Sequence, residues 1–504
     1  NGIKVMLVVQ KSDSSKIYPQ APIGTELTFD WSKKGFLTAI PESTVSIRLI
    51  LGLEKVSGSV MFDNIAIRLI SDYNVPPRDS TIPIPQYQPN GILRGAMISN
   101  NADSASVVRF GNEWKGNCIR WQLGGTSYTD ALLRPDFETL LAQELSKLDR
   151  LLPIFRSSGI SVVLDMHSLS QGLFKDTTAQ KLLIDVWKRL ATRYRNSEEI
   201  WAYDLANEPN EDSWHDEVMT LDSLYETMVK EIRKIDTGKV IILEPSWGVP
   251  SRLVNFVPVG ARSGWNFKKI VYSVHCYDPF ELTHQGIVGN YPPFGAVYPG
   301  KIAGTDWDFN RMRTALKPAV DFQKKYRVPI YIGEFSCVRW ANQKSAIRWL
   351  TDAVSLFEEY GWDWTYHAYK EFHGWSVEFD DSLYSTIPPV TTDRKELLLS
   401  YFALNKPGYN TSAKNSLDAS LTPNEVLITP NPFNPVVNIK LPLKEKVSRL
   451  HIIDIKGNKI ADLTDKGRDN IFTWNAEKFS SGIYILSLVN KSGIRQQYKL
   501  TLIR

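Results

Sequence analysis

Eight short apolar segments, most of them separated by stretches with helical periodicity, constrain the fold of residues 92–404 more than any other feature of this chain. The apolar segments show little alternation with polar residues, which is typical of strands buried on both faces of a parallel sheet. They cover residues 95–98, 118–121, 161–167, 200–205, 240–243, 270–275, 328–333 and 362–366. The helical stretches cover residues 137–155, 179–194, 221–235, 309–326, 346–360 and 395–404. This alternation predicts an α/β fold, a closed (β/α)8 TIM barrel. The alternative, an open doubly wound sheet, rarely has eight parallel strands, and no G-x-G-x-x-G follows the first strand.

Short strands with period-two alternation flank this region on both sides. We expect a small β-sandwich module at residues 1–75, with strands at 5–9, 26–31, 45–50 and 61–67, and a Pro-rich linker at 76–91. A polar linker at 405–423 precedes a second β-sandwich at 424–504, with strands at 437–441, 450–454 and 483–488. We expect the first module to pack on the barrel, so that its deletion lowers the melting temperature, and the barrel to work without the second.

Composition excludes several classes of function. The chain has 59 Lys and Arg against 55 Asp and Glu, a surplus too small for a nucleic-acid-binding surface. No run of about 18 apolar residues exists, so we expect no membrane span. The 3 Cys include no C-x-x-C pair and no H-E-x-x-H motif occurs, so we expect neither a metal nor another cofactor. The chain begins without Met, and we expect that a leader has been removed.

Polar side chains follow several of the predicted barrel strands, where the active site of such a barrel lies. Glu208 and Glu334 end the fourth and seventh strands, which places them on facing sides of the barrel. A carboxylate directly after a buried strand is costly unless it is paired or takes part in chemistry. A salt bridge to a strand-end Arg is the structural alternative for either one alone. Two facing carboxylates suit glycoside hydrolysis, in which one donates a proton and the other attacks or stabilises the anomeric carbon.

Three motifs carry a resemblance to a known family. The segments Trp201–Pro209 (WAYDLANEP), 274–277 (VHCY) and 332–335 (IGEF) resemble signatures of family-5 glycoside hydrolases, and the resemblance covers roughly residues 92–404. It implies that Glu208 is the acid/base and Glu334 the nucleophile of a retaining double displacement. With Glu208 protonated and Glu334 ionised near neutrality, we expect a bell-shaped pH profile.

The resemblance also assigns supporting roles. It implies that Asn207 binds the sugar 2-hydroxyl, that His275 lies near the acid/base and Tyr277 near the nucleophile, that Arg120 keeps the nucleophile ionised, and that His167 lines the same floor. The family usually has a Trp at the end of the eighth strand, where this chain has Tyr366-His367-Ala368, and we expect Trp375 to serve instead. Trp247 and Trp340 are further candidates for stacking on sugars, with loop packing as the alternative. Glu244 fits a structural carboxylate.

The terminal modules resemble other families. Residues 57–65 resemble the closing strands of carbohydrate-binding β-sandwiches. Residues 428–435 and 481–484 resemble Ig-like sorting domains of the type IX secretion system, which implies a secreted or cell-surface bacterial protein.

These observations favour a secreted, monomeric, endo-acting β-glycanase whose partner is a polysaccharide, with β-1,4-glucan as the first choice. An endo-β-1,4-mannanase, a xyloglucanase or a mixed-linkage glucanase would use the same catalytic frame. The alternatives from other classes are a non-catalytic polysaccharide-binding surface protein and an adhesin. The pair of strand-end acids argues against both, because binding alone needs neither of them.

Overall fold

The structure is a computed structural model that describes residues 2–21, 43–67, 75–88, 90–99, 102–124, 131–167, 172–212, 217–383 and 391–407, a few single positions and, between short gaps, 426–502. Two compact units divide the chain, Asn1–Asn410 and Thr411–Arg504. In the part that the structure describes, no helix is both long enough and apolar enough to cross a bilayer.

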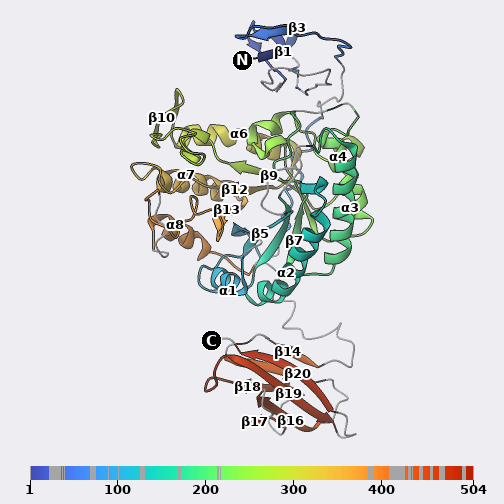
Figure 1. Ribbon diagram of the computed structural model, residues 1–504, viewed down its shortest axis with the longest axis vertical. Coiled ribbons are helices and arrows are strands. Elements are labelled where there is room, and N and C mark those ends of the chain that lie inside the picture. Colours follow the sequence, from blue (N-terminus) through green and yellow to red (C-terminus); the bar gives the residue numbers. More distant parts are fainter. Residues whose placement is uncertain are drawn as a thin grey trace. The chain divides into compact units, whose positions relative to one another are not determined.

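A closed barrel of eight parallel strands forms the centre of the first unit (Figure 1). Its strands are β4 (Arg94–Ile98), β5 (Cys118–Leu123), β6 (Ser161–Met166), β7 (Ile200–Asp204), β8 (Val240–Leu243), β9 (Ile270–Cys276), β12 (Ile330–Phe335) and β13 (Asp363–Tyr369). Each strand pairs with the next along the chain, and β13 pairs with β4 to close the ring. The predicted (β/α)8 fold is therefore confirmed.

Helices cover the outside of these strands (Figure 1). They are α1 (Ser104–Asn112), α2 (Phe137–Ser157), α3 (Thr177–Tyr194), α4 (Leu221–Arg233), α6 (Phe309–Tyr326), α7 (Ser345–Tyr360) and α8 (Asp393–Phe402). Several begin at a side-chain cap: Asp176 accepts a hydrogen bond from Thr178 N at the start of α3, and Asp308 from Arg311 N at the start of α6. Helix α1 was not predicted from the sequence, because it has only nine residues and a short apolar face.

Two connections depart from the regular alternation of strand and helix. Between β8 and β9 the chain forms three short 3-10 helices, η2 (Ser246–Gly248), η3 (Pro250–Asn255) and η4 (Ala261–Ser263). Between β9 and β12 lie a short helix, α5 (Phe280–Thr283), and a hairpin of β10 (Gly300–Ile302) and β11 (Thr305–Trp307) ahead of α6. A further 3-10 turn, η1 (Ala131–Leu133), precedes α2.

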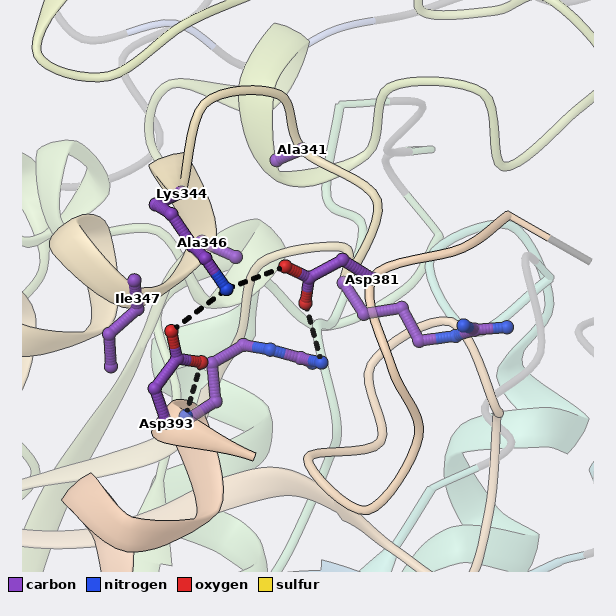
Figure 2. A pocket seen from close by; sticks show the side chains of 8 residues that line it. Ala341, Lys344, Ala346, Ile347, Asp381 and Asp393 are labelled. Atoms are coloured by element: carbon purple, nitrogen blue, oxygen red, sulfur yellow. Dashed lines mark hydrogen bonds and ion pairs between the residues drawn. The ribbon is translucent and has the colours of Figure 1, made fainter. Parts of the chain in front are cut away.

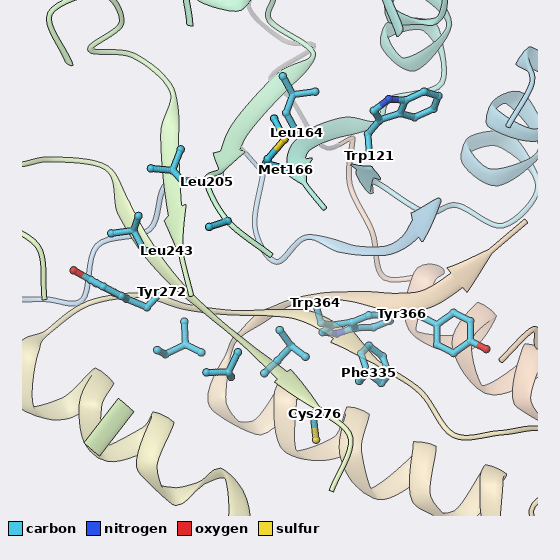
Figure 3. Packing of buried hydrophobic residues seen from close by; sticks show 14 of the residues in the cluster. Trp121, Leu164, Met166, Leu205, Leu243, Tyr272, Cys276, Phe335, Trp364 and Tyr366 are labelled. Carbon is cyan, nitrogen blue, oxygen red and sulfur yellow. The ribbon is translucent and has the colours of Figure 1, made fainter. Parts of the chain in front are cut away.

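The outward-facing strand residues pack against the helices and make the main core. Figure 3 shows part of this cluster, in which Trp121, Leu164, Leu243, Phe335 and Trp364 come from different strands. All five are fully buried. Because successive residues of a strand point to opposite faces, this outer packing leaves the intervening positions to face the inside of the barrel.

A second, smaller cluster involves the strands near their N-terminal ends. Leu93, Val163, Ile242 and Tyr331 are among its members, and Tyr87 of the Pro-rich segment packs against it. That segment is fastened to the barrel at other points, since Gln88 donates a hydrogen bond to Asp363 and Arg327 donates one to Ile82 O. The residues predicted as a linker are thus held to the barrel from Arg78 to Gln88.

The described residues of the N-terminal module form one antiparallel sheet of β1 (Gly2–Lys11), β2 (Lys16–Ile17) and β3 (Thr44–Glu54), in the order β2-β1-β3. This confirms the strands predicted at 5–9 and 45–50, while the one at 26–31 lies outside the described residues. The strand predicted at 61–67 is wrong, because this segment is not extended into a strand and pairs with none of the described strands. Met61 and Ile67 stay exposed there, so alternation alone does not create a strand without a neighbour to pair with.

The second unit contains two antiparallel sheets, β14-β15-β18 and β17-β16-β19-β20. The strands are β14 (Leu427–Thr429), β15 (Val436–Lys440), β16 (Val447–Asp454), β17 (Lys459–Asp462), β18 (Ile471–Asn475), β19 (Gly482–Asn490) and β20 (Arg495–Leu502). Side chains of both sheets, among them Val437, Trp474, Leu450 and Leu486, form one buried cluster. Two sheets that share a core in this way make a β-sandwich, as the sequence predicts.

Candidate active site

The register of the barrel brings polar side chains to the C-terminal ends of its strands. Asp165 on β6 lies beside Gln122 on β5 and Asp204 on β7. Across the barrel, Glu334 on β12 lies beside His275 on β9. In a closed parallel barrel these ends form a single rim. The register therefore collects residues that are far apart in the sequence.

Arg120 of β5 is the centre of this rim and is completely buried. Its guanidinium donates hydrogen bonds to carboxylates from four other strands or their ends, namely Asp165 (2.9 Å), Asp204 (2.9 Å), Glu244 (3.0 Å) and Glu334 (2.6 Å), and also to Asn207 Oδ1 (3.0 Å). Burial disfavours the charge of Arg120, but the carboxylates outweigh burial and raise its pKa. A buried arginine is stable only with this degree of pairing, so Arg120 fixes the positions of the groups around it.

Glu334 is buried, and both of its oxygens accept hydrogen bonds. Oε1 accepts from Arg120, and Oε2 accepts from the Tyr277 hydroxyl at 2.9 Å and lies 3.1 Å from His367 Nδ1. Burial by itself would raise the pKa of Glu334, but the charges of His275, His367 and Arg120 prevail and hold that pKa well below its usual range. Glu334 is therefore an ionised carboxylate in a water-poor site.

Glu208 has a different environment, since about a third of its side chain is exposed. Its φ of 43° lies in the left-handed region, and its backbone N–H donates to Glu244 Oε2 at 2.8 Å. Glu208 Oε1 lies 2.7 Å from His275 Nδ1, and His275 Nε2 lies 3.1 Å from Glu244 Oε1. Burial lowers the pKa of His275, but Glu244 and Glu334 outweigh burial and raise it well above the usual value. A charged His275 donates from both nitrogens, which leaves Glu208 Oε2 free of this contact.

The two predicted catalytic carboxylates lie close together. One oxygen of Glu208, one oxygen of Glu334 and one nitrogen of His275 all lie within 4.8 Å of one another. Among the described residues this is also the grouping whose spacing would suit a metal ion. Because Arg120 and two histidines already neutralise Glu334, we assign no metal ligand here.

The remaining supporting residues lie on the same rim. His167 Nδ1 is 2.9 Å from Asp165 Oδ2 and 3.9 Å from Glu334 Oε1. Burial lowers its pKa, but Asp165 reverses the effect, so the pKa of His167 is raised. Asn207 uses its oxygen to accept from Arg120, so its amide NH2 is not needed for this contact.

The three tryptophans named from the sequence are placed differently. Trp247 is 41% exposed, has a φ of 61°, and its Nε1 donates to Asp212 at 2.8 Å. Trp375 stacks on Tyr277, with ring centroids 5.5 Å apart, and also contacts His367, but only 9% of it is exposed. Trp340 is equally buried, and its Nε1 donates to Gln285 O. Trp247 therefore offers the largest exposed ring of the three.

Three residues of the site were not predicted from the sequence, namely Asp165 and Asp204, which pair with Arg120, and Glu371, which pairs with His367. His367, whose place at the end of the eighth strand was predicted, lies beside Glu334. A position at a strand end was a usable signal for Asp165 and Asp204. Nothing in the sequence pattern pointed to Glu371, which follows β13 in a loop.

Comparisons with known proteins identify two separate regions of the chain, each of which matches a different family. The family model described as cellulase (glycosyl hydrolase family 5) matches residues 86–373, more than half of the chain. A model of the secretion system C-terminal sorting domain matches residues 427–502. The C-terminal unit is thus a sorting domain, which indicates secretion or attachment to the cell surface.

Individual relatives and structures resemble the barrel region. Endoglucanase C of Acetivibrio thermocellus is 30% identical over 261 residues, which are 44% of this chain and 72% of the relative. Cellodextrinase A of Ruminococcus flavefaciens is 21% identical over 293 residues, 54% of this chain and 83% of the relative. A solved structure of Thermotoga maritima Cel5A with cellobiose covers 61% of this chain and 96% of its own, with a TM-score of 0.50 and 23% identity, and supports the fold.

Proposed function

Because the chain belongs to family 5 of the glycosyl hydrolases, the cellulase family, we propose that it is an endo-acting enzyme that hydrolyses β-1,4-glucan with retention of anomeric configuration. The observation that carries the proposal is the separation of at most 4.8 Å between oxygens of Glu208 and Glu334. Retaining glycosidases hold their carboxyl groups about 5–5.5 Å apart, whereas inverting ones leave about 6.5–9.5 Å for a water molecule.

In the first step, an oxygen of Glu334 attacks the anomeric carbon while Glu208 gives its proton to the departing glycosidic oxygen. The depressed pKa of Glu334 keeps the nucleophile ionised. Arg120 and Tyr277 hold its two oxygens, so the carboxylate needs little reorientation before attack. The bond from sugar to leaving oxygen breaks as the bond to Glu334 forms.

In the second step, Glu208 removes a proton from water, and that water displaces Glu334 from the anomeric carbon. Glu208 is suited to this exchange because its side chain is open to solvent and His275 holds one of its oxygens. In this proposal the Asn207 amide donates to the sugar 2-hydroxyl while its oxygen accepts from Arg120. Trp247 follows β8 and lies near Glu208. There its exposed ring would stack on the part of the polysaccharide that leaves in the first step.

The substrate assignment follows from the relatives named endoglucanase and cellodextrinase. Reducing-sugar release from carboxymethylcellulose, glucomannan and xyloglucan, measured in parallel, tests it. We expect the highest kcat/KM on carboxymethylcellulose, and a higher value on glucomannan or xyloglucan would replace glucan as the substrate. NMR of the first product formed tests retention, and an initial α-anomer would contradict the double displacement. Glu334→Gln is the control that should abolish both signals.

A further inference from the structure

His367, at the end of β13, lies between two carboxylates. Its Nδ1 is 3.1 Å from Glu334 Oε2, and its Nε2 is 3.1 Å from Glu371 Oε1. Only 4% of His367 is exposed, so water does not compete for either nitrogen. The proposed double displacement uses Glu334 and gives Glu371 no role.

Glu371 is itself held in place. Its second oxygen accepts a hydrogen bond from Gln122 Nε2 of β5 at 3.3 Å, while its first oxygen faces His367. One oxygen of Glu371 is thus tied to β5, and the other to the histidine that contacts the nucleophile. A side chain fixed at both oxygens sets the direction of the groups that it touches.

The loop that carries Glu371 is anchored on its far side. Arg394 of α8 donates to Ser376 O and Phe379 O of this loop and pairs with Asp381 at 3.1 Å. Figure 2 shows the neighbouring ion pairs, in which Lys344 joins Asp381 (3.1 Å) to Asp393 of α8 (3.2 Å). The loop after β13 is therefore fixed to α8 and to the start of α7.

The negative charges of Glu371 and Glu334 favour a doubly protonated His367 ring. Burial lowers the pKa of His367, but Glu371 and Glu334 outweigh burial and raise it to about 10. Burial raises the pKa of Glu371, and His367 more than compensates, so that this carboxyl also stays ionised. An imidazolium has two N–H donors and can serve both carboxylates, whereas a neutral ring has one.

Other titratable groups face this pair from every neighbouring element. They are Arg120 on β5, His167 after β6, His275 on β9, Tyr277 and His284 after β9, and Glu334 on β12. Glu334 and Glu371 are the carboxylates whose oxygens lie within hydrogen-bonding distance of His367 among the described residues. The Tyr277 hydroxyl, 2.5 Å from His367 Nδ1, also contacts Glu334, so Glu371 is the carboxylate partner of His367 that can be changed without altering the nucleophile or its contacts.

We propose that Glu371 is a positioning residue that acts through His367: it holds the histidine as a two-donor cation against Glu334, and so stabilises the nucleophile as the group that leaves in the second step. This inference rests on the proposed function, because it takes Glu334 to be the nucleophile. A cation beside Glu334 makes its carboxylate a better leaving group when water displaces it. Loss of that cation should therefore slow release of the sugar.

The test compares wild type with Glu371→Gln, which keeps the shape of the side chain and removes its charge. Asp380→Asn is the matched control, because it removes a carboxylate from the same loop where it contacts Ser382 and Arg339. NMR of histidine-labelled protein follows the rings directly; the chain has 7 His, and His367→Gln identifies the signal of interest.

In wild type and Asp380→Asn we expect no titration of His367 from about pH 5 to about pH 8.5, whereas in Glu371→Gln its midpoint should fall inside this range. The kcat of Glu371→Gln should then fall with rising pH through that midpoint, while near pH 5 it stays close to wild type. A role in packing alone would lower kcat equally at every pH.

Besides an equal loss of kcat at every pH, two NMR results would overturn the inference. One is a His367 signal that titrates near its ordinary value, about 6.5, in wild type, and the other is an unchanged His367 in Glu371→Gln. The NMR measurement needs no substrate, so it separates this inference from the proposed function. If the wild-type protein cleaved no β-glycan, the proposed function would be refuted. The NMR titration would still decide whether Glu371 controls the protonation of His367.

Discussion

Glu334 and Asp363 are buried carboxylates on the neighbouring strands β12 and β13, at opposite ends of the barrel. Glu334 is held ionised, because His275, His367 and Arg120 overcome the cost of burial. Asp363 accepts hydrogen bonds from Leu93 N and Gln88, but burial prevails there and raises its pKa to about 7.

The contrast shows how one barrel separates chemistry from stability. The rim surrounds its carboxylate with cations, which prepares the group for reaction. At the opposite end, the Asp363 carboxyl holds Gln88 of the Pro-rich segment and the backbone of Leu93 against β13, and hydrogen bonding matters more there than charge. The following predictions test this division, beginning with the largest expected effect.

Glu334→Gln should reduce turnover of β-1,4-glucan by roughly 10⁴-fold or more, because the amide cannot form the covalent intermediate. Added azide should restore part of the rate on an activated aryl glycoside by attacking the anomeric carbon in place of Glu334. The azide product should have the inverted configuration, which NMR can determine. A variant that keeps more than a few per cent of its activity without azide would show that another group is the nucleophile.

Glu208→Gln should lose about 10²- to 10⁴-fold on polysaccharide, where the leaving oxygen needs a proton. Formation of the glycosyl-enzyme from a dinitrophenyl glycoside should change far less, since that leaving group departs without protonation. Pre-steady-state bursts on the two substrate classes measure the difference. Equal losses on both classes would contradict the acid role.

Asp363→Asn should leave kcat/KM unchanged and alter stability in a pH-dependent way. The folded pKa of Asp363, about 7, lies above its usual 3.8, so the folded state retains a proton that the unfolded chain has lost. The contribution of Asp363 to the free energy of unfolding of the wild type is therefore fully present below pH 3.8. It is lost as the pH rises to about 7. Asn does not titrate. The free energy of unfolding of Asp363→Asn, relative to that of wild type, should therefore increase by roughly 1.4 kcal/mol per pH unit between about pH 5 and pH 7.

Thermal melts across this pH range test the Asp363 prediction. Asp321→Asn, which removes a carboxylate from an exposed pair with Lys317 on α6, is the control and should show no such trend. A constant difference between Asp363→Asn and wild type at all pH values would mean that Asp363 is ionised in the folded protein. An accompanying loss of activity would break the separation between the two ends of the barrel.

Removal of residues 424–504 should have the smallest effect, because the rim residues described above all belong to the first compact unit, Asn1–Asn410. We expect kcat/KM and the melting temperature of the barrel to stay within error of the full chain. Secretion from the native host should fail, since the truncation removes the sorting domain. A clear fall in the melting temperature of the barrel would show that the two units stabilise each other.

The sequence predicted the barrel strands closely, because strands buried on both faces leave a strong apolar pattern. It located Glu208, Glu334 and Arg120 through the same pattern, as polar residues placed on or after such strands. It was less successful where order depends on pairing, as with residues 61–67, and with the short helix α1. It also treated residues 76–91 as a linker, whereas Tyr87 and Gln88 are fastened to the barrel.

What the sequence determined by itself was the periodicity, and with it the fold class and the strand ends that hold the chemistry, since both depend on local patterns of apolar and polar residues. Only the tertiary structure decided which charges meet. Arg120 reaches residues 45 to 214 positions away in the chain, and Glu371 meets Gln122 from 249 positions away. The ionisation of a carboxylate depends on the groups within a few ångströms and on its access to water, and only the closed barrel sets those distances.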